Sequence, residues 1–440
     1  MERPFSVEER RQIIDVLQPE PDAWQASLAD LSDQDLKAMI LREAAVEAGQ
    51  RVSPRQVDQL WGFQPASRDI PGEFEAARVK ARLGPWLQTL GPPGQAYQDL
   101  RAAKRRYGRL VALGGWPVLP QGPVLRDGDA DSLVEALRRR LRAEGYEITG
   151  EGDRFDAHLA SALKTYQVRH GLTPDGVLGP RTRASLDVSA QDRLAQIEAN
   201  LERARWLPRP HAPERLEVDV ASATATLFEA DVPVLSMRVV VGDLRHKTPI
   251  FASRLDAVVV NPPWNVPASI ATNEILPRAA RDPGYLTRNG FRSVDGRLQQ
   301  RPGAANALGR LKFDLQSPYG VYLHDTPEKN AFSREKRTLS HGCMRLENPE
   351  ALAQWLLARQ GWPANRLASA IADGETRRIA LDRPLSLLVV YRTAVVSDGG
   401  LHLLPDPYQW DTSLARALAG TVLADTGARD ASDCAEQLER

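Results

Sequence analysis

The hydrophobic periodicity of this chain changes once, near Leu216, and this change limits the possible folds more than any other feature. Before it, apolar residues recur at helical spacing, as they do over residues 13–17. After it, apolar and polar residues alternate. Runs with this β pattern occur at residues 216–220, 225–228, 237–241, 256–260, 320–323 and 385–391. In a chain of 440 residues we therefore expect a multidomain α+β protein of about three domains, with a helical part before a mostly-β part.

The helical part divides into a scaffold and a small module. Residues 1–121 carry helical patterns but no recognisable chemistry, and they end in a linker that contains Pro and Gly. Residues 122–188 predict a three-helix module, which is smaller than most catalytic domains. Its helices are expected at about 132–145, 155–171 and 183–186. Residues 189–213 are expected to form a charged linker helix that completes the scaffold.

The mostly-β part is expected over residues 214–396. Its strand pattern is interrupted from about 265 to 312, where we expect helices at 270–275 and 277–281 and then a polar loop. An insertion of this length inside a β domain is usually functional, often as a lid over a site, and a plain surface excursion is the alternative. Residues 397–440 are expected to be a C-terminal extension.

Charge and hydropathy exclude two classes of partner. Lys plus Arg and Asp plus Glu are equal at 57 each, so no overall field attracts nucleic acid. The basic run from Arg138 to Arg142 is expected to be a solvated helix face. No apolar run approaches the ~18 residues that span a bilayer, and the charged segment Met1 to Arg11 does not look like a signal peptide. These residues leave open whether the protein is cytoplasmic or has an export segment outside this numbering.

The chemistry is concentrated in Ser340-His341-Gly342-Cys343 and in His324, which precedes the cysteine by 19 positions. Acyl transfer by cysteine needs a base, usually histidine, that removes the thiol proton. It also needs backbone N–H groups that stabilise the oxyanion, and Gly342 lets the backbone turn its amides inward. We expect Cys343 to be exposed at this turn and His324 to be held at a strand end, open to solvent. A buried structural cysteine is the alternative, which the polar neighbours disfavour.

The role of His341 stays open at this point. It could orient the substrate, help to complete the oxyanion site, or bond to a nearby carbonyl. A zinc site built from His324, His341 and Cys343 is also conceivable, although no paired zinc-binding motif supports it. The second cysteine, Cys434, stands in no motif and is expected to be incidental.

At these residues the sequence resembles the L,D-transpeptidases with a YkuD-like catalytic domain, whose signature is a His, a gap, and then Ser/Thr-His-Gly-Cys. It is more narrowly similar to the large Gram-negative branch, which joins a scaffold, a peptidoglycan-binding domain and a catalytic domain with a lid. The supporting stretches are Asn200–Pro208, Val240–Gly242, Thr248-Pro249, Asn261–Pro267, Pro302-Gly303, Asn306–Gly309, Lys312-Phe313 and His324–Pro327. The three-helix module resembles the peptidoglycan-binding domain through Leu137–Tyr146, Leu163–Gln167, Gly171-Leu172 and Asp175–Pro180.

The resemblance implies a role for each matching residue. Cys343 would be the nucleophile and His324 its base, oriented by a main-chain carbonyl, so that Asp325 need not act as a triad acid. Arg345 stands where many smaller relatives have Asn, and it could steer a substrate carboxylate. The oxyanion and substrate-contacting residues would come from Trp264, Tyr322, Ser340, His341, Gly342 and Arg345.

The implied activity is cross-linking of peptidoglycan stem peptides. Cys343 would attack the bond between meso-diaminopimelate and D-alanine in a donor tetrapeptide, releasing D-alanine. The diaminopimelate amine of an acceptor stem would then take the thioester and give a 3→3 cross-link. No cofactor and no metal are implied, carbapenems are expected to acylate Cys343, and the expected location is the periplasm. Other wall-synthesis proteins are further candidate partners.

Three rival functions are compatible with these residues. Water could resolve the same thioester, which would make the protein an L,D-carboxypeptidase. The protein could instead be a non-catalytic wall-binding protein that uses the module at 122–188. The same chemistry with another acceptor would attach an outer-membrane protein to the wall.

Overall fold

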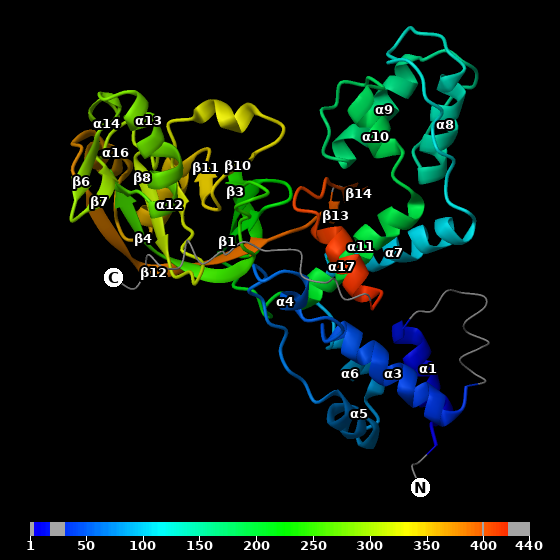
Figure 1. Ribbon diagram of the computed structural model, residues 1–440. Helices are drawn as coiled ribbons and strands as arrows, with labels where there is room; N and C mark the ends of the chain where they lie inside the picture. Colours follow the sequence, from blue (N-terminus) through cyan, green and yellow to red (C-terminus); the bar gives the residue numbers. More distant parts are fainter. Residues whose placement is uncertain (1–3, 18–30, 398–399, 421–440) are drawn as a thin grey trace. The chain divides into compact units, whose positions relative to one another are not determined.

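The computed structural model describes residues 4–17, 31–397 and 400–420, which form two compact units (Figure 1). Among these residues the first unit contains those before Leu60, Phe63–Arg209 and those after Tyr391, and the second contains Leu60–Gly62 and Pro210–Tyr391. The first unit is largely helical and the second is rich in strands, so the multidomain α+β class expected from the sequence is confirmed. Cys434 and the part of the expected extension beyond residue 420 lie outside the described residues.

The first unit is built from helices with polar N-caps and apolar inner faces. The hydroxyls of Ser32 and Ser189 accept the amides of Asp35 and Asp192, which fixes the starts of two of its helices. Its helices are α1 (Val7–Leu17), α3 (Asp33–Glu47), α4 (Pro54–Val57), α5 (Ile70–Val79), α6 (Leu83–Gln88), α7 (Gln95–Ala112), α8 (Leu133–Glu144), α9 (Ala157–Arg169), α10 (Pro180–Leu186), α11 (Ala190–Trp206) and α17 (Trp410–Leu418). The hairpin of β13 (Ala394–Ser397) and β14 (Gly400–Leu403) packs with α7 and α11 in one apolar cluster.

Helices α8, α9 and α10 form the expected three-helix module around its own core. Val134, Leu137, Leu163 and Tyr166 are fully buried in this core. The glycine Gly145 ends α8 in the left-handed region, at φ 91°, where a side chain would be strained.

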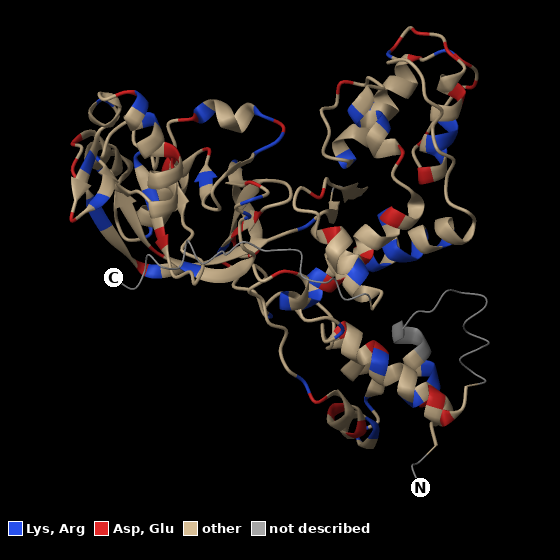
Figure 2. Cartoon of the chain, viewed as in Figure 1, with Lys and Arg blue, Asp and Glu red and all other residues tan. Residues whose placement is uncertain are grey.

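Figure 2 shows basic and acidic residues interspersed in each unit, in keeping with a formal net charge of +0.

The expectation that the basic run on α8 is a solvated face is wrong for two of its arginines. Arg138 and Arg140 are 1% and 0% exposed, whereas Arg139 is exposed. Arg138 pairs with Asp156 at 2.6 Å, and Arg140 pairs with Glu144 at 2.9 Å. Burial of a guanidinium is tolerated here because each one meets a carboxylate and at least one carbonyl oxygen.

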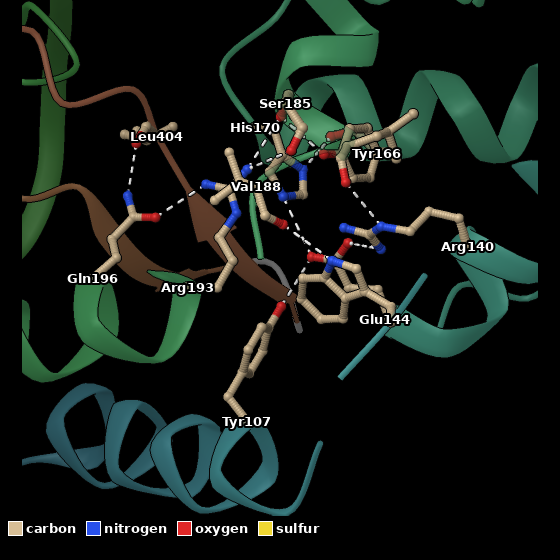
Figure 3. Close-up of polar contacts among 12 residues, drawn as sticks. Tyr107, Arg140, Glu144, Tyr166, His170, Ser185, Val188, Arg193, Gln196 and Leu404 are labelled. Carbon is tan, nitrogen blue, oxygen red and sulfur yellow. Dashed lines mark hydrogen bonds and ion pairs between the residues drawn. The ribbon is translucent and has the colours of Figure 1, made fainter. Parts of the chain in front are cut away.

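Glu144 is the centre of a buried polar network in the first unit (Figure 3). Its carboxylate accepts a hydrogen bond from the Tyr107 hydroxyl at 3.0 Å and pairs with Arg140, while Nε2 of His170 lies 3.4 Å away. Burial alone opposes ionisation, but His170 and Arg140 lower the pKa of Glu144 well below its ordinary value. Because Tyr107 belongs to α7 and His170 directly follows α9, this one carboxylate ties the module to the scaffold helix.

The second unit is a nine-stranded mixed sheet that closes on itself. Its strands are β1 (Arg215–Asp219), β2 (Thr224–Glu229), β3 (Val232–Gly242), β4 (Phe251–Val260), β8 (Leu311–Leu315), β9 (Leu323–His324), β10 (Thr338–Ser340), β11 (Met344–Leu346) and β12 (Arg377–Val390). The order is β10-β3-β11-β9-β8-β4-β12-β1-β2, and β3 also pairs with β2 at the far end of that order. The pairs β1–β12, β9–β11 and β3–β10 are parallel, and the others are antiparallel. Helices α15 (Pro349–Ala358) and α16 (Ala364–Ala372) and the short 3₁₀ helix η2 (Lys329–Ser333) complete this unit.

The strand runs read from the sequence are largely confirmed, with one correction. The run expected at 320–323 is in strand conformation only from Leu323, because Gly320 turns the chain with a φ of 63°. The strands β8, β10 and β11, each of three to five residues, were not expected.

The interruption from about 265 to 312 forms a small subdomain. The polar loop expected after its helices is found at residues 301–310, but residues 285–300 form a further helix and two strands instead. The helical part of the subdomain is α12 (Ala268–Ile270), the π-helix η1 (Ala271–Ile275), α13 (Leu276–Arg281) and α14 (Tyr285–Arg288). It continues in a three-stranded sheet of order β5-β7-β6, formed by β5 (Trp264–Asn265), β6 (Phe291–Val294) and β7 (Arg297–Gln300). Asp295 and Gly296 both have positive φ, 50° and 78°, which is the conformation that joins two strands by a two-residue turn. The Asp-Gly pair was a hairpin signal in the sequence.

No helix among the residues that the structure describes has the length and apolar character required to cross a bilayer.

Candidate active site

The strands β9 and β11 bring the two residues of the expected catalytic pair to one face of the sheet. They run parallel, with Arg345 opposite His324 and Met344 opposite Leu323. Leu323 and Met344 are fully buried and define the core face. Alternation along β11 places Cys343, one residue before Met344, on the same face as Arg345 and therefore as His324. Cys343 and His324 are thus diagonal neighbours across two paired strands, a separation that side chains can bridge.

Cys343 is half-buried, whereas His324 is 5% exposed, so the expectation that His324 is open to solvent is wrong. The reason is its place on a strand with a neighbour on each side, β8 and β11. Burial, reinforced by the positive charges of Arg345 and Lys312, lowers the pKa of His324 to about 3 from an ordinary value of 6.5. The imidazole is therefore neutral at physiological pH and able to accept a proton.

A main-chain carbonyl fixes the orientation of this imidazole. Nδ1 of His324 lies 2.5 Å from the carbonyl oxygen of Asp325, so a neutral ring donates its Nδ1–H there and keeps a lone pair on Nε2. The Asp325 carboxylate has other partners, since it accepts from Nζ of Lys329 at 2.7 Å and from the amide of Arg310 at 2.8 Å. The carbonyl of Asp325, and not its carboxylate, orients the ring.

The turn before Cys343 is held by two buried hydroxyl groups. Gly342 has a φ of 103°, a conformation that favours glycine, and its amide donates to the Ser340 hydroxyl at 3.2 Å. The same hydroxyl donates to the carbonyl of Cys343 at 2.6 Å. On the other side, the hydroxyl of Thr248 accepts from the amide of Gly242 and donates to the carbonyl of Gly342, both at 2.8 Å.

His341 contacts the subdomain that interrupts the sheet. Its Nε2 lies 2.7 Å from Oε1 of Glu274, which is part of the π-helix η1. The ring of His246 packs at 4.6 Å from that of His341, and Nδ1 of His246 lies 3.1 Å from Asp243. The partner of His341 is therefore a carboxylate side chain and not a carbonyl oxygen, while its roles in orienting the substrate or completing the oxyanion site stay predictions.

The remaining expected site residues fall into two places. Tyr322 lies beside His324, with ring centroids 5.6 Å apart, and Lys312 sits 4.6 Å above its ring. Arg345 reaches Glu328, an exposed residue, at 2.7 Å. Trp264 lies instead within the small subdomain, where it packs on Phe291 at 6.3 Å as part of that subdomain's apolar cluster.

Two residues of this site, Glu274 and Thr248, were not identified as functional from the sequence. Thr248 belongs to a Thr-Pro step that supported the family resemblance, so a signal for it was present. Glu274 is one charged residue in a helical pattern, and only the fold brings it to His341. No group of three or more His, Cys, Asp or Glu side chains suited to a metal ion occurs within the described part of the chain.

Two family models match parts of the chain. Residues 213–377 match the family model of YkuD, the L,D-transpeptidase catalytic domain. Residues 130–186 match the family described as "Putative peptidoglycan binding domain". The second match covers helices α8, α9 and α10, and the first covers the strands of the nine-stranded sheet up to the first residue of β12.

Two curated relatives match parts of the chain. A "Putative L,D-transpeptidase" of Haemophilus influenzae is 30% identical over 250 residues, which is 52% of this chain and 51% of that protein. The N-acetylmuramoyl-L-alanine amidase CwlL of Bacillus licheniformis is 33% identical over 67 residues, which is 15% of this chain and 19% of that protein. The chain thus spans about half the length of the first relative and about a fifth of the second.

Solved structures of L,D-transpeptidases are also similar to this chain. That from Xylanimonas cellulosilytica is 20% identical and covers 61% of this chain and 99% of its own, with a TM-score of 0.22. That from Stackebrandtia nassauensis is 14% identical and covers 64% of this chain and 99% of its own, with a TM-score of 0.27.

Proposed function

We propose that this protein cross-links peptidoglycan stem peptides through Cys343, because residues 213–377 match the L,D-transpeptidase catalytic domain and residues 130–186 match a peptidoglycan-binding domain. The cross-link is of the 3→3 type, between two diaminopimelate residues. The donor is a tetrapeptide stem, and D-alanine is released. The observation that carries the proposal is the shared sheet face of Cys343 and a neutral His324.

Acylation starts with transfer of the Cys343 thiol proton to Nε2 of His324. The sulfur attacks the carbonyl between diaminopimelate and D-alanine, the C–N bond breaks, and the leaving amine of D-alanine takes the proton back from the imidazole. The Nδ1–H of His324 donates to the Asp325 carbonyl throughout, which keeps the lone pair on Nε2 and orients it. A thioester on Cys343 results, and the diaminopimelate amine of an acceptor stem resolves it.

Stabilisation of the oxyanion is assigned to backbone amides near Cys343. The left-handed conformation of Gly342 sets the direction of the backbone amides in the turn. Ser340 and Thr248 keep the turn rigid through hydrogen bonds from their buried hydroxyls. Tyr322 and His341 flank this turn. Arg345 is placed to steer a substrate carboxylate, since its partner Glu328 is exposed and exchanges readily with a competing anion.

The other parts of the chain receive roles in the same proposal. Residues 122–188 hold the enzyme to peptidoglycan, and residues 1–121 and 189–213 form the scaffold. Residues 214–396 are catalytic, with residues 265–312 and Trp264 as a lid over the site, and residues 397–440 are a C-terminal extension. The location is periplasmic, where the stem peptides are found.

The test is mass spectrometry of the purified protein with a carbapenem or with a disaccharide-tetrapeptide. A mass increase on Cys343, release of D-alanine and a cross-linked dimer are expected, and none of these should occur with Cys343→Ala. A tripeptide product without dimer would identify a carboxypeptidase instead. An unmodified thiol, together with full biological function of the Cys343→Ala variant, would identify a non-catalytic wall-binding protein.

A further inference from the structure

The turn that holds Cys343 has a histidine on each side, here called its first and second flank, and the two flanks differ in chemistry. On the first flank, His324 is buried and lies close to the cations Arg345 and Lys312. On the second flank, His341 pairs with the carboxylate of Glu274. Cys343 joins the two, because it shares a sheet face with His324 and is only two residues from His341.

The second flank is open to solvent, as an entry site for a substrate must be. The side chains of His341 and Glu274 are 39% and 37% exposed, whereas His324 is 5% exposed. A buried carboxylate–histidine pair could serve packing alone. A pair of this exposure contributes little to stability, so packing does not explain why it stands beside Cys343.

The groups behind this pair hold it in place. His246 packs against the His341 ring, and Asp243 accepts the amides of Arg245 and His246, both at 2.8 Å, as well as facing the His246 ring. Glu274 itself is presented by the π-helix η1, an extra-wide turn between α12 and α13. The carboxylate and the imidazole are thus carried by different elements, and both side chains are accessible to solvent.

We infer that Glu274 and His341 form the acceptor site, in which Glu274 binds the side-chain ammonium of the incoming diaminopimelate and His341 takes a proton from it. This inference rests on the proposed function, since it concerns the second step of that reaction. The chemistry fits because an ammonium is bound by a carboxylate and attacks a thioester only after it loses a proton.

The step balances as follows. In the pair, Nε2–H of His341 donates to Glu274. The acceptor ammonium therefore gives one proton to Nδ1 of His341, and the imidazolium passes a proton to solvent. The amine nitrogen then forms a bond to the thioester carbonyl carbon, and the C–S bond breaks with its electron pair left on the sulfur of Cys343. The second nitrogen-bound proton returns to that sulfur through His324. Donor acylation does not use Glu274 at all, so the two steps can be separated by experiment.

The experiment compares Glu274→Gln with the unsubstituted full-length chain, using disaccharide-tetrapeptide as donor and acceptor. Release of D-alanine in the acylation burst should stay within about twofold, while the ratio of cross-linked dimer to hydrolysed tripeptide falls at least about tenfold. The concentration of acceptor that gives half-maximal dimer formation should rise, and Glu274→Asp should restore part of the lost ratio. Asp295→Asn, which neutralises an exposed carboxylate at the β6–β7 turn, is the matched control and should leave the ratio unchanged.

Three outcomes would overturn the inference. An unchanged dimer-to-tripeptide ratio in Glu274→Gln would show that Glu274 does not bind the acceptor. An equal decrease in the rates of acylation and of dimer formation would show that Glu274 only stabilises the position of the subdomain beside the site. Absence of any acyl-enzyme in the unsubstituted chain would refute the proposed function itself, and this inference with it.

Discussion

The hydroxyl of Ser340 donates a hydrogen bond of 2.6 Å to the carbonyl of Cys343, three residues later, and it also accepts the amide of Gly342. One buried hydroxyl therefore fixes the backbone on both sides of the Gly342–Cys343 peptide bond. Ser340, which precedes His341, is thus a structural part of the turn that holds Cys343.

Replacing Ser340 with Ala should lower both stability and activity. Two buried backbone groups lose their partner, which costs about 1–3 kcal/mol, and the turn that aims the amides near Cys343 loosens. We expect the acylation rate to fall about tenfold or more in stopped-flow measurements with a carbapenem, with a lower midpoint in urea. Retained stability together with an unchanged acylation rate would contradict this role.

Thr248→Val tests the opposite side of the same turn. Valine has nearly the same shape but leaves the Gly242 amide and the Gly342 carbonyl without their shared hydroxyl. The expected loss in free energy of unfolding is about 1–3 kcal/mol. Thr248→Ser keeps the hydroxyl and is the control. In the same denaturant titration it should keep most of the stability that Thr248→Val loses.

Asp325→Asn should leave acylation nearly unchanged. The carboxylate faces Lys329 and the Arg310 amide, and the His324 ring is held by the main-chain carbonyl, which the substitution preserves. We expect a change in acylation rate of less than about threefold, whereas loss of a true triad carboxylate costs about 10⁴-fold in rate. A loss approaching that size would mean that the carboxylate acts on His324 after all.

The buried His324 should make the second unit less stable in acid. Its pKa is about 3 in the folded protein and 6.5 ordinarily, so the unfolded chain binds more protons between these values. The stability that neutral His324 allows is fully present above about pH 6.5 and is lost as the pH falls toward 3, by up to about 1.4 kcal/mol per pH unit. Chemical denaturation at several pH values should show a shallower acid slope for His324→Gln than for the unsubstituted protein. Equal slopes in the two proteins would contradict the low pKa.

The buried network around Glu144 predicts that breaking it will cause a large loss of stability in the first unit. Arg140→Met removes the cation that faces the Glu144 carboxylate and the donor to the Leu186 carbonyl. Breaking a buried pair from one side costs about 3–5 kcal/mol, and we expect hydrogen exchange to accelerate throughout α8. Arg139→Met, at the exposed neighbouring position, is the control and should leave exchange in α8 unchanged.

The sequence alone determined the fold class, the helical module and the nucleophile motif with its distant histidine. These are local properties, because periodicity reports which face of an element is buried, and Ser-His-Gly-Cys is contiguous. It also predicted where the sheet would be interrupted, although it missed the hairpin at Asp295-Gly296, whose turn signal was present.

Only the tertiary structure decided what surrounds those residues. The sequence predicted a solvated face for Arg138 and Arg140, but both are buried: Arg138 meets Asp156 from another segment, and Arg140 meets Glu144 one turn along the same helix. It also predicted that His324 is open to solvent, but the neighbouring strands enclose it. Glu274 carried no signal, and only the fold brings it to His341. Burial depends on elements that are distant in the chain, and even a local ion pair does not reveal whether the fold will cover it.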